Sequence, residues 1–112
     1  MIIFEDKTKK IMKNILVTLE VDKSNLDYTT RLVNDFAQNI KELHPGLNFF
    51  KAMTSAAKPA NFYIFLSFDT DKDYDDYKMH ERTKKFTVRL HAMSKGLPVF
   101  TELNEVNLSS EG

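Results

Sequence analysis

The segment from Asn61 to Phe68 restricts the possible folds most strongly, because six of its eight residues are apolar. At alternate positions it places four apolar side chains on one face of a predicted strand: Phe62, Ile64, Leu66 and Phe68. The opposite face carries Tyr63 and Phe65, which are also apolar. An antiparallel strand with one solvated face normally alternates apolar and polar residues. A strand that is apolar on both faces must be covered on both, so we expect helices on one side and a second subunit on the other.

The other elements are predicted from the period of their apolar residues. Period-two alternation predicts further strands at residues 14–21, 47–54 and about 99–108. A stripe of period 3.6 predicts a helix over residues 26–43, with Ser24 as its N-cap and Asp27 at the capping-box position. A second helix is expected to begin near Asp71 or Asp73, bend near residues 80–83, where apolar side chains are missing, and continue to about Ser94.

This order of elements, β-α-β-β-α-β, is that of the ferredoxin-like α+β fold with an antiparallel sheet. Right-handed crossovers put both helices on one face of the sheet. The other face would be a large apolar patch in a monomer, so we expect a homodimer that pairs two sheets face to face. The domain is predicted to span residues 14–108. Residues 1–13 are expected to form a solvated arm or an edge strand, and residues 109–112 a tail.

Length and composition exclude several classes of protein. A chain of 112 residues fits one domain. The absence of Cys excludes disulfides, a thiolate nucleophile and Cys-ligated metals. Sixteen basic and sixteen acidic residues cancel, which argues against a nucleic-acid partner. No stretch resembles a signal peptide or a membrane span, so we expect a cytoplasmic protein without a membrane partner.

Two groups of residues invite a metal-site interpretation, and neither fits one. The acidic run from Asp69 to Asp76 lacks the glycine and the final carboxylate of an EF-hand loop, and acids are ordinary in the first turn of a helix. His80 and His91 would lie about 16 Å apart along one continuous helix, too far to share a metal. His80 is therefore either a solvated histidine at a helix bend or a single acid or base in a pocket. No hydrolase or nucleotide-binding motif is present.

An aromatic group surrounds the central strand and the second helix: Tyr63, Phe65, Phe68, Tyr74, Tyr77 and Phe86. These side chains are either ordinary core or the walls of an apolar pocket for a flat organic ligand.

The segment from Leu66 to Leu90 resembles a known family. Leu66-Ser-Phe68 ends a strand, Asp73-Tyr-Asp-Asp-Tyr77 begins a short helix, a polar bend follows, and Lys85-Phe86 leads to Leu90. Over residues 14–108 this pattern is similar to the antibiotic biosynthesis monooxygenase (ABM) domain family of the dimeric α/β-barrel superfamily. The resemblance implies a ferredoxin-like domain that dimerises through its sheets, with a pocket between sheet and helices.

The resemblance also implies an activity. Many members oxidise aromatic polyketides or quinols with O₂ and no cofactor. A branch that degrades haem carries Trp, Asn and His where this chain has Phe68, Glu20 and Thr87, which makes haem degradation the less favoured interpretation. For a cofactor-independent monooxygenase acting on a small aromatic substrate, Glu20 and His80 are the candidate bases. The candidate pocket residues are Thr18, Phe68, Tyr77 and Phe86. The alternative is a non-catalytic dimer that binds a small ligand or acts as an interaction module.

Overall fold

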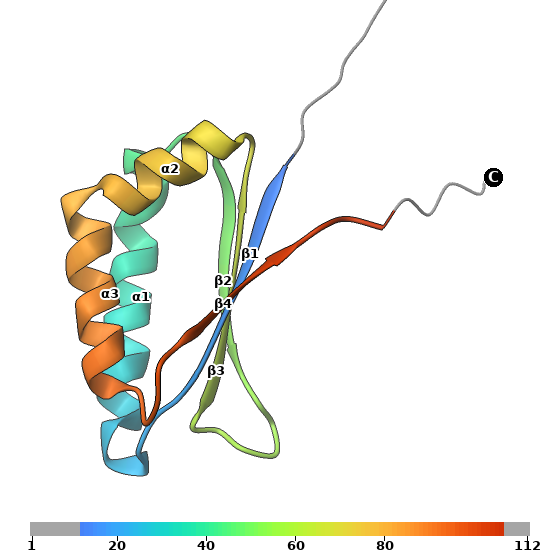
Figure 1. Ribbon diagram of the computed structural model, residues 1–112. Helices are drawn as coiled ribbons and strands as arrows, with labels where there is room; N and C mark the ends of the chain where they lie inside the picture. The colour runs from blue at the N-terminus through green and yellow to red at the C-terminus, as the bar shows by residue number, and fades with distance from the viewer. Residues whose placement is uncertain (1–11, 107–112) are drawn as a thin grey trace, which may run out of the picture.

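The computed structural model describes residues 12–106 and has the predicted architecture (Figure 1). The elements in order are β1 (Lys13–Glu20), the 3-10 turn η2 (Lys23–Asn25), α1 (Leu26–Leu43), β2 (Leu47–Thr54), β3 (Asn61–Phe68), α2 (Asp71–Met79), α3 (Glu81–Met93) and β4 (Val99–Leu103). The four strands form one antiparallel sheet in the order β2-β3-β1-β4. The helices form a single layer on one face of this sheet, which confirms the ferredoxin-like prediction.

The core lies between that helical layer and the sheet. Strand register aligns Val17 of β1 with Ile64 of β3 on one side and Phe100 of β4 on the other. The apolar face of β1 and the alternate residues Phe62 to Phe68 of β3 are buried against the helices. From the helices, Val33 and Ile40 of α1 and Phe86 and Leu90 of α3 complete the core. The apolar faces that period-two spacing predicts for the strands and period-3.6 spacing predicts for the helices therefore pack against each other, as expected.

The bend between α2 and α3 occurs at His80, where it was predicted. His80 has an extended backbone, with φ −68° and ψ 139°, and its Nδ1 atom accepts a hydrogen bond from the Arg82 backbone N–H at 3.1 Å. At the start of α2, the Thr70 hydroxyl accepts a hydrogen bond from the Asp73 backbone N–H at 3.1 Å. Each segment thus has its own N-cap, and α3 leaves the bend in a new direction.

Some predicted boundaries are wrong. No side chain caps the start of α1: Asn25 is the residue before that helix, and Ser24 lies in the preceding 3-10 turn. β4 ends at Leu103, earlier than the predicted residue 108. Lys13 is the first residue of β1 and pairs with Glu102 and Asp71, so it is not part of a solvated arm. The predictions for residues 1–11 and 107–112 lie outside the described residues.

The sheet face opposite the helices is apolar and uncovered in the single chain. The side chains of Phe49, Met53, Tyr63 and Val99 are 41%, 49%, 36% and 55% exposed. Phe65 is half-buried and packs against Phe49, with ring centroids 5.3 Å apart. This patch follows from the apolar character of β3 on both of its faces. Within residues 12–106, no helix has the length and apolar character needed to cross a bilayer.

Candidate functional site

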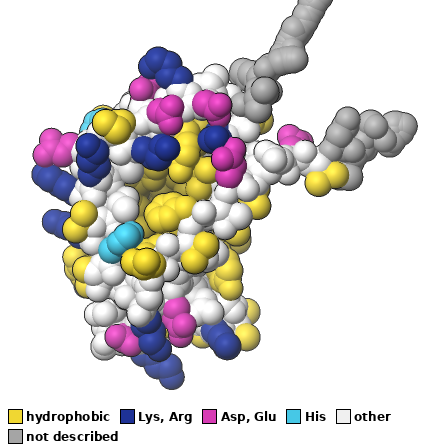
Figure 2. Space-filling model, viewed as in Figure 1, with side chains coloured by type: hydrophobic (Ala, Val, Ile, Leu, Met, Phe, Trp, Pro, Cys, Tyr) yellow, Lys and Arg dark blue, Asp and Glu magenta, His cyan; other side chains and the backbone are white. Residues whose placement is uncertain are grey.

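A cavity of about 470 Å³ lies between the helix-facing side of the sheet and the two helices α2 and α3. It opens between α3 and β4, where Figure 2 shows a hollow lined with hydrophobic side chains. Nine apolar residues form its floor and walls: Ile15, Val17, Phe50, Ile64, Leu66, Phe86, Val88, Leu90 and Phe100. Its size and apolar lining are those of a small-molecule site.

Hydroxyl groups gather at the corner of the cavity where α2 meets α3. Tyr77 and Thr83 are 8% and 4% exposed, and both line the cavity. The Thr83 hydroxyl is buried and has no hydrogen-bond partner among the described residues. Burial also raises the pKa of the Tyr77 hydroxyl, with a smaller contribution from Tyr74, so this group stays protonated at neutral pH. Among the described residues with an unpartnered buried polar atom, Thr83 is the one that lines this cavity; the others are Thr29, His44, Asn61 and Ser67.

Two lysines lie beside these hydroxyl groups at the mouth of the cavity. Lys78 is 3.5 Å from a carboxylate oxygen of Asp75, and its ammonium group is 4.4 Å from the centre of the Tyr74 ring. Lys84 is exposed, lines the cavity next to Thr83, and makes no ion pair with another described residue. The residues that line the cavity include these two cations and no carboxylate. These two ammonium groups are therefore the charged groups that a ligand in the cavity would meet first.

A second, charged hollow adjoins the mouth. There the Lys13 ammonium group lies 2.8 Å from Glu102 and 3.3 Å from Asp71, which joins β1 to β4 and to the start of α2. Asp71 and Glu102 thus share Lys13, and Asp75 is paired with Lys78, so Lys84 is the lysine at this mouth that has no ion-pair partner among residues 12–106.

The predicted pocket residues separate into two groups. Tyr77 and Phe86 line the cavity. Phe68 is fully buried and does not line it; its ring lies behind the wall, 5.2 Å and 5.0 Å from the ring centres of Tyr74 and Tyr77. Thr18 lies on the opposite face of the sheet, aligned with Tyr63 and Val99, so its placement in this pocket was wrong.

The two candidate bases do not converge. Glu20 ends β1 beside Lys95, with a carboxylate oxygen 3.6 Å from the Lys95 ammonium group. His80 lies at the other end of α3, a helix of thirteen residues and therefore about 20 Å long. Neither side chain lines the cavity. Within one subunit, Glu20 and His80 therefore cannot act on the same ligand in this cavity.

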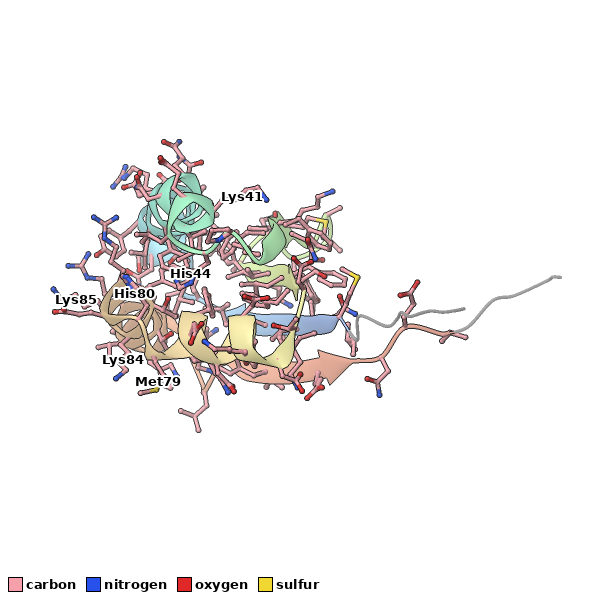
Figure 3. All side chains as sticks on the ribbon, turned by 90° about the horizontal axis from the view of Figure 1, so that it is seen from above. Lys41, His44, Met79, His80, Lys84 and Lys85 are labelled. Atoms are coloured by element: carbon pink, nitrogen blue, oxygen red, sulfur yellow. The ribbon has the colours of Figure 1, made fainter. Side chains whose placement is uncertain are left out.

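His80 is paired with another histidine instead. Figure 3 shows His44 and His80 side by side at the end of α1, and their ring centroids are 5.3 Å apart. His44 is buried, and its Nε2 atom has no hydrogen-bond partner among the described residues. This pair lies on the α1 side of the bend, whereas the cavity opens toward β4. His80 is therefore not placed to bind a ligand in the cavity. No cluster of three His, Cys, Asp or Glu side chains suited to a metal ion occurs in residues 12–106.

The burial of His44 predicts that the free energy of unfolding decreases in mild acid. Burial lowers the pKa of His44 below its ordinary value of 6.5, and the nearby His80 lowers it further, although Asp76 and Asp73 oppose the shift. The unfolded chain therefore binds more protons than the folded one as the pH falls below 6.5, and stability present above that pH is lost. Urea unfolding midpoints should fall between pH 7.5 and pH 5.5, and His44→Gln should remove most of that fall. His91→Gln, at an exposed position on α3, is the control, and an equal fall in wild type and His44→Gln would contradict the prediction.

Sequence reasoning missed Thr83 and Lys84. A signal for Thr83 was present, because Thr83, Phe86 and Leu90 follow the helical spacing that defines the inner face of α3. Lys84 follows Thr83 directly, and nothing in the sequence distinguishes it from the adjacent Lys85. Only the position of β4 shows that Lys84 lines the cavity and that Lys85 lines a groove between α1 and α3.

No protein-family model matches the sequence, and no curated protein matches it. Solved structures do match the fold. A candidate antibiotic biosynthesis monooxygenase from Nitrosomonas europaea aligns with 90% of this chain and 96% of its own, at 14% identity and a TM-score of 0.78. One from Caulobacter crescentus aligns with 88% and 92%, at 16% identity and a TM-score of 0.80. A Bacteroides thetaiotaomicron protein described as a possible oxidoreductase aligns with 87% and 100%, at 8% identity and a TM-score of 0.77. This chain therefore has the ferredoxin-like fold seen in structures described as antibiotic biosynthesis monooxygenases.

Proposed function

We propose that this protein is a cofactor-independent monooxygenase that oxidises a small, flat aromatic molecule bound in the cavity between the sheet and the helices α2 and α3. The observation that carries the proposal is the apolar cavity with buried hydroxyl groups at one corner. Further support comes from the fold, which matches structures described as antibiotic biosynthesis monooxygenases. We also propose that the protein acts in the cytoplasm, as a homodimer in which the two subunits pair through their sheet faces.

The chemistry requires an electron-rich substrate anion. A phenol or quinol that loses its proton places negative charge on its oxygen, and the delocalised anion can then react with O₂. In an anthrone-type substrate the ring CH₂ becomes C=O: one oxygen atom enters the product, and the other leaves with both hydrogens as water. The substrate supplies all the electrons, so no external reductant is consumed.

Tyr77 and Thr83 have the properties needed to stabilise such an anion. We infer that each donates a hydrogen bond from its hydroxyl group to the substrate oxygen, and the apolar surroundings strengthen that bond. The Thr83 oxygen has almost no accessible surface in the free chain, so its side chain must turn toward the ligand to do so. The Lys84 ammonium group at the mouth, which has no ion-pair partner among the described residues, favours the ionised substrate over the neutral one. In this mechanism the protein shifts the ionisation of the substrate electrostatically, and neither Glu20 nor His80 removes the proton.

A second candidate function is ligand binding without catalysis. It is favoured by one observation: none of the residues that line the cavity is a histidine or a carboxylate that could act as a general base. A protein of this kind would hold a flat apolar ligand and present it, or sense it, through the dimer.

Oxygen uptake with dithranol or a naphthoquinol, with and without chelator, separates the two functions. We expect consumption of one O₂ per dithranol, a rate unchanged by chelator, and loss of activity in Thr87→Phe, whose ring would fill the cavity. Thr30→Phe, at an exposed position on α1, is the control for the same change in another helix. Stoichiometric binding of these compounds without oxygen uptake would favour the second function, and absence of both would contradict the proposed site.

A further inference from the structure

The charges around the cavity identify the substrate more closely. We propose that the ligand carries a carboxylate as well as its aromatic rings, and that this carboxylate binds to Lys84, with Lys78 beside it, at the mouth of the cavity. The inference rests on the proposed function only in placing the ligand in this cavity. It narrows the proposed substrate class to aromatic acids, which should bind more tightly than neutral aromatic molecules of the same shape.

The first argument is a lysine at the mouth of the cavity that lacks an ion-pair partner. Two ammonium groups and no carboxylate line this cavity. The acids nearest the mouth are occupied: Asp71 and Glu102 pair with Lys13, and Asp75 pairs with Lys78. Lys84 alone of the two lining cations has no ion-pair partner among residues 12–106. A ligand carboxylate would supply the missing anion.

The second argument is the division of the cavity into a polar corner and an apolar remainder. The buried hydroxyl of Thr83, which has no partner among the described residues, lies one residue before Lys84, and Tyr77 faces the same corner from α2. Away from that corner the walls are apolar, from Val17 on β1 to Leu90 on α3. An amphipathic molecule with its acid group at the corner and its rings along the walls satisfies both parts. Since α3 begins at Glu81, the positive end of its dipole also lies at this corner.

Lys85 is a matched control within the same helix. Lys84 and Lys85 are adjacent exposed lysines of α3, and Figure 3 shows their side chains leaving the helix in different directions. Lys85 lies 3.4 Å from Glu81 and lines the groove between α1 and α3, not the cavity. Replacing either lysine by methionine removes one charge from the same helix, but only Lys84→Met removes it from the cavity.

The test is calorimetric titration of the full chain with 2-naphthoate and 2-naphthamide, which share a ring system and differ in charge. We expect naphthoate to bind at least about tenfold more tightly, as one charge-assisted contact provides. Lys84→Met should remove this preference for naphthoate over naphthamide, whereas Lys85→Met should retain it. The preference should also weaken at high salt.

The outcomes distinguish this inference from the proposed function. Equal affinities for the two compounds in the wild-type protein would overturn the carboxylate inference and leave the cavity as a ligand site. If Lys84→Met and Lys85→Met lose the preference for naphthoate equally, the inference is also overturned. The preference would then depend on the net charge of the protein and not on a charge at the cavity. If neither compound binds, the cavity is not an aromatic site, and the inference and the proposed function fail together.

Discussion

Phe65→Glu is expected to convert the proposed homodimer into a monomer at micromolar concentration. Phe65 lies near the middle of the uncovered sheet face, between Leu16 of β1 and Lys51 of β2 in the strand register. We propose that a second subunit covers this face. A carboxylate at its centre would be taken out of water by the second subunit, and this desolvation is unfavourable even beside the Lys51 ammonium group on the neighbouring strand. A stable interface of this kind should bury more than about 2,000 Å² in total.

The expected effect on the dissociation constant is large because, in a two-fold symmetric dimer, the same residue contributes to the interface from both subunits. Each substitution is therefore present twice in the interface. Loss of an aromatic contact at the centre of an interface costs about 2 kcal/mol or more. Two such losses raise the dissociation constant by about 1,000-fold. Sedimentation velocity across a concentration series would measure this shift directly.

Met79→Glu is the matched control for dimerisation. Met79 is 69% exposed, but it belongs to α2 in the helical layer and lies away from the uncovered sheet face. The same change of an exposed apolar residue to glutamate should therefore leave the dimer intact. A wild-type protein that sediments as a monomer at micromolar concentration would contradict the proposed pairing of sheets. A dimer that persists unchanged in Phe65→Glu would place the interface elsewhere.

The sequence was sufficient to predict the fold because its strongest patterns are also its structural determinants. The double-sided apolar strand at residues 61–68 became β3 with the predicted bounds, buried on one face and partly exposed on the other. The absence of apolar residues between His80 and Lys85 predicted the bend that separates α2 from α3. Strand ends were harder to predict. Apolar residues continue to Leu108, whereas β4 ends at Leu103, because its pairing with β1 stops where β1 begins.

The site was predicted only in part, and strand parity explains one error. Ile15 and Val17 face the helices, so Thr18 and Glu20, which both have the opposite parity, face away from the cavity. Thr18 has the opposite parity and lies on the outer face, a result that the alternation alone could have given. Lys84 could not have been predicted this way, because its role depends on how α3 is placed above β4.

The last prediction concerns the two buried hydroxyl groups. Tyr77→Phe and Thr83→Val each remove one hydroxyl from the polar corner while keeping nearly the same shape. If these groups stabilise the substrate anion, each change should lower kcat for dithranol oxidation by about 10²-fold, the usual effect of losing one hydrogen-bond donor to a developing anion. Glu20→Gln and His80→Ala should each change kcat by less than about tenfold, well below the loss expected of a general base.

Stability provides an independent measurement that separates a functional hydroxyl from a structural one. The Thr83 hydroxyl is buried without a partner among the described residues, so it contributes no hydrogen bond to the free protein. Replacing it by a methyl group of similar size should leave the melting temperature of the free protein unchanged or raise it. Proteins commonly retain such unfavourable groups where function requires them. Thr83→Val should therefore be at least as stable as the wild type and much less active. A variant that loses stability and activity together would indicate a structural role, and a stable variant with full activity would remove Thr83 from the mechanism.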